Sequence, residues 1–272
     1  MSSSIAPTST ILYLDLDDCA LGCIWPSVDK PRSPIDRRVF SQFVDELGRH
    51  DVSVHFLTNR PPAQLPLAGH ILGGPALYQF AESGMSAWLP EENRAIVNPA
   101  FEEFAAEVRP EIMARLQREI GLSWRGPVVE EFGDRLVTAT IFPLDCTLDA
   151  VTALTQHVRE LLADLPVDVR QGKGADIAPA GATKLEGCLW AEELHERLHG
   201  VPIDWSKVLY LEDSVTGLEA ARYIAAHGGQ VGAVANAEPA FRAAVEEAGG
   251  ILCRRAELDG VLQAVRLWLE QP

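Results

Sequence analysis

The sequence predicts an α/β protein: a Rossmann-like parallel sheet core with an inserted α+β cap domain. Two observations lead to this fold class. Apolar runs alternate with amphipathic segments at both ends of the 272-residue chain, and strands that alternate with helices form parallel sheets covered on both faces. The middle of the chain differs, because a long helical pattern is followed there by patterns typical of antiparallel strands and hairpins.

The N-terminal elements follow from the spacing of apolar residues. The run at 11–14 predicts a first strand, and "SPID" at 33–36 predicts the start of a helix whose apolar residues recur through 39–47. The stretch "VSVHFLTNR" predicts a second strand that ends at Thr58. A weaker third strand is expected at 76–80.

The C-terminal part alternates between helix and strand in the same way. We expect helices at 184–198, 215–226, 239–248 and 260–269, and strands at 208–211, 231–235 and 251–253.

The central part predicts a separate α+β unit. Its expected elements are a helix at 99–120, a strand at 135–142, a helix at 148–163 and a two-stranded hairpin at 167–178. We therefore expect residues 1–90 and 179–272 to form the core domain and residues 91–178 to form the inserted cap. The Pro-containing segments 61–66 and 179–183 are the expected hinges.

The composition excludes several classes of protein. A hydrophobic content of 47% and a charged content of 23% are typical of a globular protein. The net charge of -16 argues against nucleic-acid binding, which needs a basic surface. There is no signal peptide pattern, no apolar stretch of about 20 residues to span a membrane, and an odd number of scattered cysteines. We expect a reduced, cytoplasmic protein, either a monomer or a homodimer.

Acidic residues directly follow two of the predicted parallel strands. "ILYLDLDD" places Asp15 and Asp17 after the first strand, and "YLEDS" places Glu212 and Asp213 after a late one. Ligands of such sheets bind at the carboxyl ends of the strands, so these carboxylates are expected to meet. Like charges at close range repel, and a hard cation that prefers oxygen ligands would neutralise them. We therefore expect a Mg²⁺ site formed by Asp15, Asp17, Glu212 and Asp213.

With Mg²⁺ present, the favoured substrate is a small phosphate ester. Aspartate ionises at about pH 4, so Asp15 would attack phosphorus at neutral pH without a base and form an aspartyl-phosphate. Asp17 would protonate the leaving alcohol and later deprotonate the attacking water. Thr58 would donate a hydrogen bond to a phosphoryl oxygen, and Lys184 would offset the charge of the transition state.

Four short motifs in this order resemble those of haloacid dehalogenase-superfamily phosphatases. They are D-x-D at Asp15 and Asp17, an apolar strand ending on Thr58 in "HFLTNR", Lys184 in "PAGATKLEG", and the acidic pair Glu212 and Asp213 in "LYLEDSVTGLEAA". The resemblance covers both core segments, about two-thirds of the chain. It implies a Mg²⁺-dependent phosphatase that acts through an aspartyl-phosphate.

The spacing of these motifs indicates the subgroup. Asp15 and Thr58 are 43 positions apart, too few for a cap, whereas 126 positions separate Thr58 from Lys184. A cap at this place is similar to that of Cof-type and sucrose-phosphatase-like members, whose substrates are mostly phosphorylated sugars and related small esters. Thr216 and Gly217 stand where Cof-type members carry Asn and Asp. The text "EDSVTGLEAA" instead resembles the phosphoglucomutase-like branch, in which the Glu-Asp pair supports the metal, directly or through water.

Four further residues are candidates for substrate binding. Asn59 and Arg60 follow Thr58 and are expected to face the phosphate, while Arg170 and Lys173 lie on the cap hairpin where a sugar or glycerate group would be recognised. Each of them can equally be a structural or solvent-exposed residue. Two other functions also fit the motifs: a phosphomutase that returns the phosphoryl group to the sugar, and a catalytically silent protein that binds a sugar phosphate.

Overall fold

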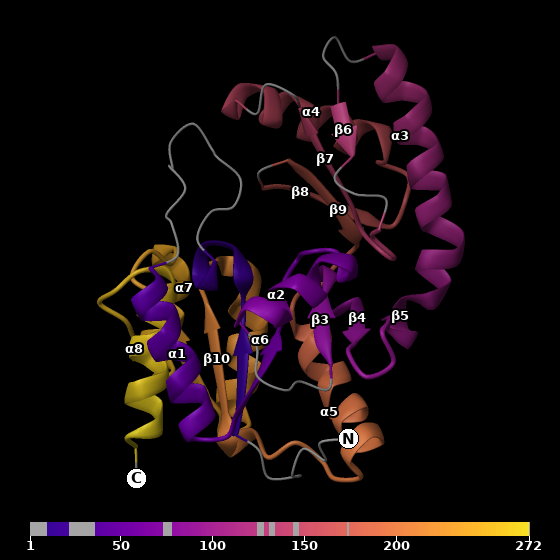
Figure 1. The fold of residues 1–272 in the computed structure, drawn as a ribbon. Coiled ribbons are helices and arrows are strands. Elements are labelled where there is room, and N and C mark those ends of the chain that lie inside the picture. The colour runs from indigo at the N-terminus through magenta and orange to yellow at the C-terminus, as the bar shows by residue number, and fades with distance from the viewer. Residues whose placement is uncertain are drawn as a thin grey trace.

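The computed structural model of the chain describes residues 10–21, 36–72, 78–123, 128–130, 134–143, 147–172 and 174–271. These residues form two parts, a core built on a parallel sheet and a smaller domain that stands above the carboxyl ends of its strands (Figure 1). The predicted fold class is confirmed.

The core sheet has five parallel strands in the order β12-β11-β10-β1-β2. The strands are β1 (Thr10–Leu14), β2 (Val52–Phe56), β10 (Val208–Glu212), β11 (Gln230–Ala233) and β12 (Ile251–Leu252). In β1, Leu14 lies beside Leu211 of β10 on one side and beside Phe56 of β2 on the other. The ends of the first and the late strand, about 200 residues apart in the sequence, are therefore neighbours.

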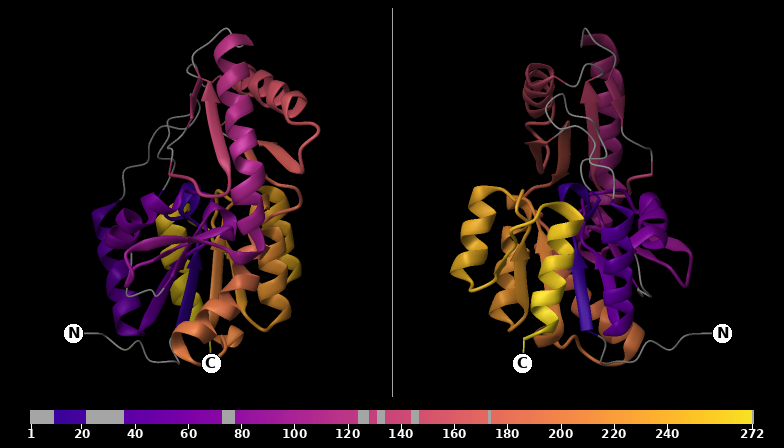
Figure 2. Two further views of the ribbon diagram at one scale, coloured as in Figure 1. Left: turned by 90° about the vertical axis from the view of Figure 1, so that its right-hand side faces the viewer. Right: turned by 60° about the vertical axis from the view of Figure 1, so that its left-hand side comes forward.

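Helices cover both faces of this sheet. Those of the core are α1 (Arg37–Arg49), α2 (Leu65–Leu72), α5 (Leu185–His199), α6 (Leu218–Ala226), α7 (Pro239–Glu247) and α8 (Glu257–Leu269). α1 packs against α8, whereas α5 packs against α6, and the two groups lie on opposite sides of the strands (Figure 2). All residues of β2 and β10 are buried, as expected for strands with both faces covered.

A small antiparallel sheet extends the core beside β2. It contains β3 (Gln79–Ala81), β4 (Ser86–Leu89) and β5 (Arg94–Val97), and a single bridge between Leu57 and Phe80 links it to the main sheet. The hairpin of β4 and β5 has no counterpart in the sequence prediction. Ile96 of β5 packs against the core cluster although the sequence interpretation places it in the cap.

The cap is an antiparallel sheet in the order β6-β7-β9-β8 with two helices against it. Its elements are α3 (Arg109–Ser123), β6 (Val128–Glu130), β7 (Ala139–Pro143), α4 (Leu148–Leu161), β8 (Val167–Gln171) and β9 (Ala175–Pro179). Ile112 of α3 and Leu154 of α4 meet Ile141 and Ile177 of the sheet in a core of their own.

The chain crosses between the two domains at two places. The first is the helical stretch 99–108 that continues into α3, and the second is the segment 180–184 before α5 (Figure 1). The second crossing agrees with the predicted hinge at 179–183. The prediction of a hinge at 61–66 is wrong, because Pro62–Gln64 form a helical turn that leads into α2 of the core.

Candidate active site

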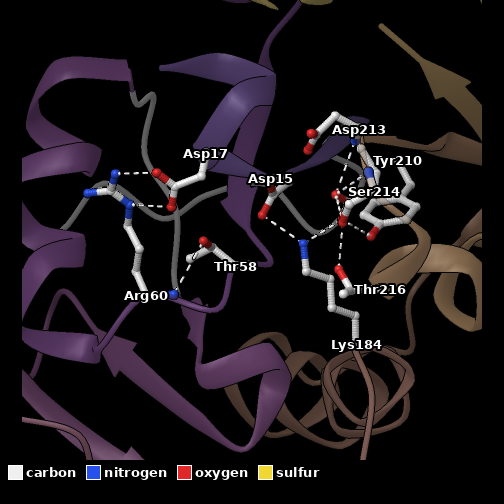
Figure 3. Close-up of polar contacts among 10 residues, drawn as sticks. Asp15, Asp17, Thr58, Arg60, Lys184, Tyr210, Asp213, Ser214 and Thr216 are labelled. Carbon is white, nitrogen blue, oxygen red and sulfur yellow. Dashed lines mark hydrogen bonds and ion pairs between the residues drawn. The ribbon is translucent and has the colours of Figure 1, made fainter. Parts of the chain in front are cut away.

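The carboxyl ends of the central strands bring the first and fourth motifs together. Asp15 follows β1, and its backbone N–H donates to the carbonyl of Leu211 in β10 at 3.0 Å. Asp213 follows β10 directly, and Lys184 stands at the N-terminus of α5. The close-up shows Lys184 reaching Asp15, with Asp213 on the neighbouring strand end (Figure 3).

Lys184 joins two carboxylates below the surface of the site. Its Nζ donates to Asp15 at 2.7 Å and also to Glu212. The exposed fractions are 2% for Lys184, 5% for Asp15 and 0% for Glu212. A cation at a helix N-terminus opposes the helix dipole, so this position is justified by the two carboxylates rather than by the helix.

The charges of this cluster shift several pKa values. Burial and the nearby Glu212 raise the pKa of Asp15 to about 7, although Lys184 acts in the opposite direction. Burial, together with Glu212 and Asp15, raises the pKa of Asp213 to about 10. Burial alone would raise the pKa of Glu212, but Lys184 and the surrounding donors outweigh it and lower that pKa. In Lys184, the two carboxylates outweigh burial and raise the pKa.

Glu212 is held by a complete set of hydrogen bonds. One oxygen accepts from Lys184 and from the hydroxyl of Tyr210 at 2.8 Å, and the other accepts from the backbone and hydroxyl of Ser214 and from the backbone of Asp213. Gly217 is required for this arrangement, because a Cβ there would lie 2.6 Å from the Glu212 Cγ. Gly217, which stands where Cof-type members carry Asp, thus leaves space for the carboxylate of Glu212 at the end of β10.

The acidic cluster fits a divalent cation. Oxygen atoms of Asp15, Glu212 and Asp213 lie within 4.8 Å of one another, and a set of carboxylate oxygens suits Mg²⁺. Asp15 and Asp213 line the cavity and would face a bound ion, while Glu212 lies behind them and accepts a hydrogen bond from Lys184. Burial, and after it the neighbouring carboxylates, raises the pKa values of Asp15 and Asp213, and a bound cation would favour their ionised forms.

Asp17 is placed differently from its neighbour Asp15. Arg60 holds its carboxylate with two hydrogen bonds, from Nε at 3.0 Å and from Nη2 at 2.7 Å (Figure 3). The Asp17 side chain lies outside the cluster of Asp15, Glu212 and Asp213, so the geometry gives no support to Asp17 as a side-chain ligand of the metal. Its position at the cavity remains compatible with proton transfer.

The second motif lies on the other side of Asp15 from Lys184 and Asp213 (Figure 3). Thr58 is 1% exposed, lines the cavity, and accepts a hydrogen bond from the backbone N–H of Arg60 at 3.4 Å. Asn59 also lines the cavity, and its carbonyl accepts from the Arg135 guanidinium at 2.9 Å.

A cavity of about 440 Å³ lies between the core and the cap, a volume in the range of small-molecule sites. Its floor carries the residues described above. Its cap side is lined by Arg135, Thr140, Phe142, Gln171, Gly172, Gly174 and Asp176.

The predicted cap contacts are only partly located. Arg170 does not line the cavity; its guanidinium donates to the carbonyl of Ala182 at 2.6 Å and to Asp168 at 3.2 Å, so its predicted contact with substrate has no geometric support. The adjacent Gln171 faces the cavity instead, since successive side chains of a strand point to opposite faces. Lys173 lies outside the described residues.

Sequence reasoning missed Arg135, which is 4% exposed and lines the cavity from the cap. It is the first residue of the strand predicted at 135–142, where an arginine is unremarkable. Its one detectable signal is a basic residue at the start of the segment "RLVTATIF", which alone does not indicate a site.

Neither a protein-family model nor a curated protein matches this sequence. Solved structures do match its fold. Sucrose-phosphatase from Synechocystis sp. PCC6803, solved with sucrose and phosphate, has a TM-score of 0.60 at 14% identity, covering 96% of this chain and 98% of its own. The C-terminal domain of C. albicans trehalose-6-phosphate phosphatase gives 0.63 at 14% identity, covering 96% and 91%. A haloacid dehalogenase-like hydrolase from Bacteroides thetaiotaomicron gives 0.55 at 15% identity, covering 96% and 99%.

These matches extend over nearly the whole of each chain, cap included, at low identity. The chain therefore has the fold of the haloacid dehalogenase-like hydrolases, and the resemblance indicated by its four motifs is confirmed at the level of the fold. Within the described ranges, every helix is too short or too polar to cross a bilayer.

Proposed function

We propose that this chain is a Mg²⁺-dependent phosphatase that hydrolyses a small phosphorylated sugar or a related polyol or glycerate phosphate. The observation that carries the proposal is the convergence of Asp15, Thr58, Lys184 and Asp213 on one cavity beneath the cap. Sucrose-phosphatase and trehalose-6-phosphate phosphatase share the fold, which supports a sugar phosphate as the substrate.

Each residue of this site has a distinct part in the mechanism. The Asp15 carboxylate attacks phosphorus and forms an aspartyl-phosphate, while Lys184 orients it through their 2.7 Å hydrogen bond. The Thr58 hydroxyl donates to a phosphoryl oxygen from the other side of the cavity. Mg²⁺ held by Asp15 and Asp213 would supply positive charge that keeps these carboxylates ionised and offsets the charge of the phosphoryl group.

Asp17 carries the proton transfers. Arg60 fixes its carboxylate at the cavity, where it would take a proton from the water that hydrolyses the aspartyl-phosphate. To protonate the leaving alcohol in the first step, one Asp17 oxygen must turn from Arg60 toward the substrate. The cap covers the cavity during these steps and limits the entry of water.

The test is a substrate screen with matched variants. Phosphorylated sugars, polyols and glycerate derivatives are incubated with the purified chain and Mg²⁺, and released phosphate is measured. Asp15→Asn should lose activity by at least about a thousandfold, the loss typical of a nucleophile, while keeping the wild-type fold as measured by circular dichroism. Asp36→Asn is the control, because Asp36 caps α1 on the surface and Asn caps helices equally well.

The products separate this function from its alternatives. Equal amounts of free phosphate and dephosphorylated alcohol support hydrolysis, whereas an isomerised sugar phosphate identifies a phosphomutase. Binding of a sugar phosphate without any turnover identifies a silent binding protein. Retained activity in Asp15→Asn would refute the assignment of the nucleophile.

A further inference from the structure

The turn Glu82–Gly84 between β3 and β4 has an unusual backbone. Its φ angles are 49° at Glu82, 60° at Ser83 and 91° at Gly84, so two residues other than glycine adopt the left-handed region. Such conformations persist where the surroundings fix them, and they concentrate at functional sites. The contacts of this turn identify what fixes it.

The side chain of Glu82 binds the cap. It is 0% exposed, and its carboxylate accepts hydrogen bonds from three consecutive backbone N–H groups of the cap, those of Leu136, Val137 and Thr138, at 2.8 to 3.1 Å. The Thr138 hydroxyl donates a fourth at 2.8 Å, and Ser86 of the core donates a fifth at 2.5 Å. A carboxylate, which only accepts, matches five donors.

The backbone of the same turn binds the loop of the second motif. The N–H of Glu82 donates to the carbonyl of Arg60, and the N–H of Ser83 donates to the carbonyl of Thr58, both at 2.9 Å. From the cap side, Arg135 donates to the carbonyl of Asn59 at 2.9 Å. The cap loop and this turn therefore hold three successive carbonyls of the site.

Arg60 continues this connection to the predicted acid–base residue. Its backbone carbonyl accepts a hydrogen bond from the N–H of Glu82, and its guanidinium donates two hydrogen bonds to Asp17. A displacement of the 58–60 loop must therefore shift the Asp17 carboxylate or break this pair. A continuous series of hydrogen bonds therefore connects the cap to Asp17 through Glu82 and Arg60.

The turn also lies against the helix that carries Lys184 and against the two interdomain crossings. A Cβ on Gly84 would lie 2.1 Å from the backbone nitrogen of Gly187, three residues after Lys184. Met85 forms a small apolar cluster with Val137 of the cap loop and with residues of the second crossing. This part of the structure is the side of the cavity on which the cap is attached.

We propose that Glu82 is a positioning residue: it forms a third, non-covalent attachment of the cap to the core and sets the orientation of Asp17 through Arg60. The two covalent crossings hold the cap by the backbone alone, and the three N–H bonds to Glu82 add a further contact beside them that restrains its tilt. The catalytic part of this inference rests on the proposed phosphatase function; the attachment itself does not.

The first test measures amide hydrogen exchange in Glu82→Gln. Glutamine keeps the size of the side chain but replaces one acceptor oxygen by an NH₂ group that faces N–H and O–H donors. We expect exchange at 136–138 to accelerate about tenfold or more, the loss expected for one hydrogen bond to a charged group. Exchange at 58–60 and 16–18 should accelerate with it. Ser86→Ala is the control, since it removes a donor to the same carboxylate from the core side only.

The second test compares leaving groups. For an alkyl ester such as glucose 6-phosphate, departure of the alcohol needs a proton from Asp17, so kcat/KM of Glu82→Gln should fall about tenfold or more. For p-nitrophenyl phosphate, whose leaving group needs no proton, the fall should stay below about threefold. Ser86→Ala should leave both values within about twofold. A general structural role would slow both substrates equally.

The outcomes decide between the possibilities. Accelerated exchange confined to 136–138, or equal losses with both esters, overturns the proposal. If no phosphate ester is turned over by the wild-type chain, the proposed function fails, and the exchange pattern still decides the attachment and its coupling to 58–60. If Glu82→Gln does not fold, Thr138→Val serves instead, because it removes the donor hydroxyl on the cap side and keeps the shape of the side chain.

Discussion

Replacing Lys184 by Met removes the cation between two buried carboxylates and keeps the apolar stem of the side chain. The side chains of Lys184, Asp15 and Glu212 are 3%, 7% and 0% exposed, so solvent cannot replace the lost ammonium. Removing one partner of a buried ion pair costs about 3–5 kcal/mol, and we expect Lys184→Met to lower the free energy of unfolding by about 4 kcal/mol at pH 7.5.

Denaturant unfolding without Mg²⁺ measures this loss. Lys207→Met is the matched control, because the Nζ of Lys207 lies 3.4 Å from Asp204 with 44% of its side chain exposed, and exposed pairs contribute less than about 1 kcal/mol. The double variant Lys184→Met/Glu212→Gln also removes the negative charge of the buried Glu212 carboxylate that has lost its partner. It should be more stable than Lys184→Met alone by about 2 kcal/mol.

Two results would refute this reasoning. One is a Lys184→Met variant that unfolds within about 1 kcal/mol of Lys207→Met, which would mean that the buried carboxylates do not need their cation. The other is a double variant no more stable than Lys184→Met. Lowering the pH should also reduce the deficit, because the unpaired carboxylates then take up protons and lose their charge.

Further predictions concern the steric space at Gly217, metal binding and the pH dependence of stability. Gly217→Ala should cost about 1–3 kcal/mol and displace Glu212, whereas Gly48→Ala, with nothing within 4 Å of its Cβ, should not destabilise the chain; denaturation of both variants tests this. EDTA should stop phosphate release, and Mg²⁺ should raise the unfolding temperature of the wild type but not of Asp213→Asn, as calorimetry can show. Burial lowers the pKa of His55 to about 3, so this residue is neutral in the folded state and protonated in the unfolded state below pH 6.5. Stability contributed by neutral His55 is therefore present above pH 6.5 and is lost as the pH falls, by about 2 kcal/mol at pH 5. His55→Gln should reduce this pH dependence of the free energy of unfolding, which urea titrations above pH 6.5 and at pH 5 measure.

The principal residues of the candidate site could be predicted from the sequence because the topology of a parallel sheet determines where they lie. Parallel strands end at one edge, so Asp15, Thr58 and Asp213 could be expected to meet once their strands were recognised. The structure brings Lys184 to the same point, as expected. Their catalytic and metal-binding roles stay predictions.

Contacts that depend on register or on distant backbone were not accessible. Whether Arg170 or Gln171 faces the cavity depends on the phase of one cap strand, and a shift by one residue reverses it. The pairing of Asp17 with Arg60 joins two loops whose path the sequence does not define. Glu82 lies in a weakly patterned stretch, and its donors are backbone groups of a segment more than 50 residues away, which carry no side-chain signal.

The position of β1 between β10 and β2 has a consequence for the synthesis of the chain. Its neighbour β2 follows within about 40 residues, but its other neighbour, β10, leaves the ribosome only after the entire cap has been made. Until then one side of an apolar strand has no hydrogen-bonding partner, which is the condition under which chains aggregate or recruit chaperones. A nascent chain truncated before residue 208 can therefore complete neither its central sheet nor the acidic cluster.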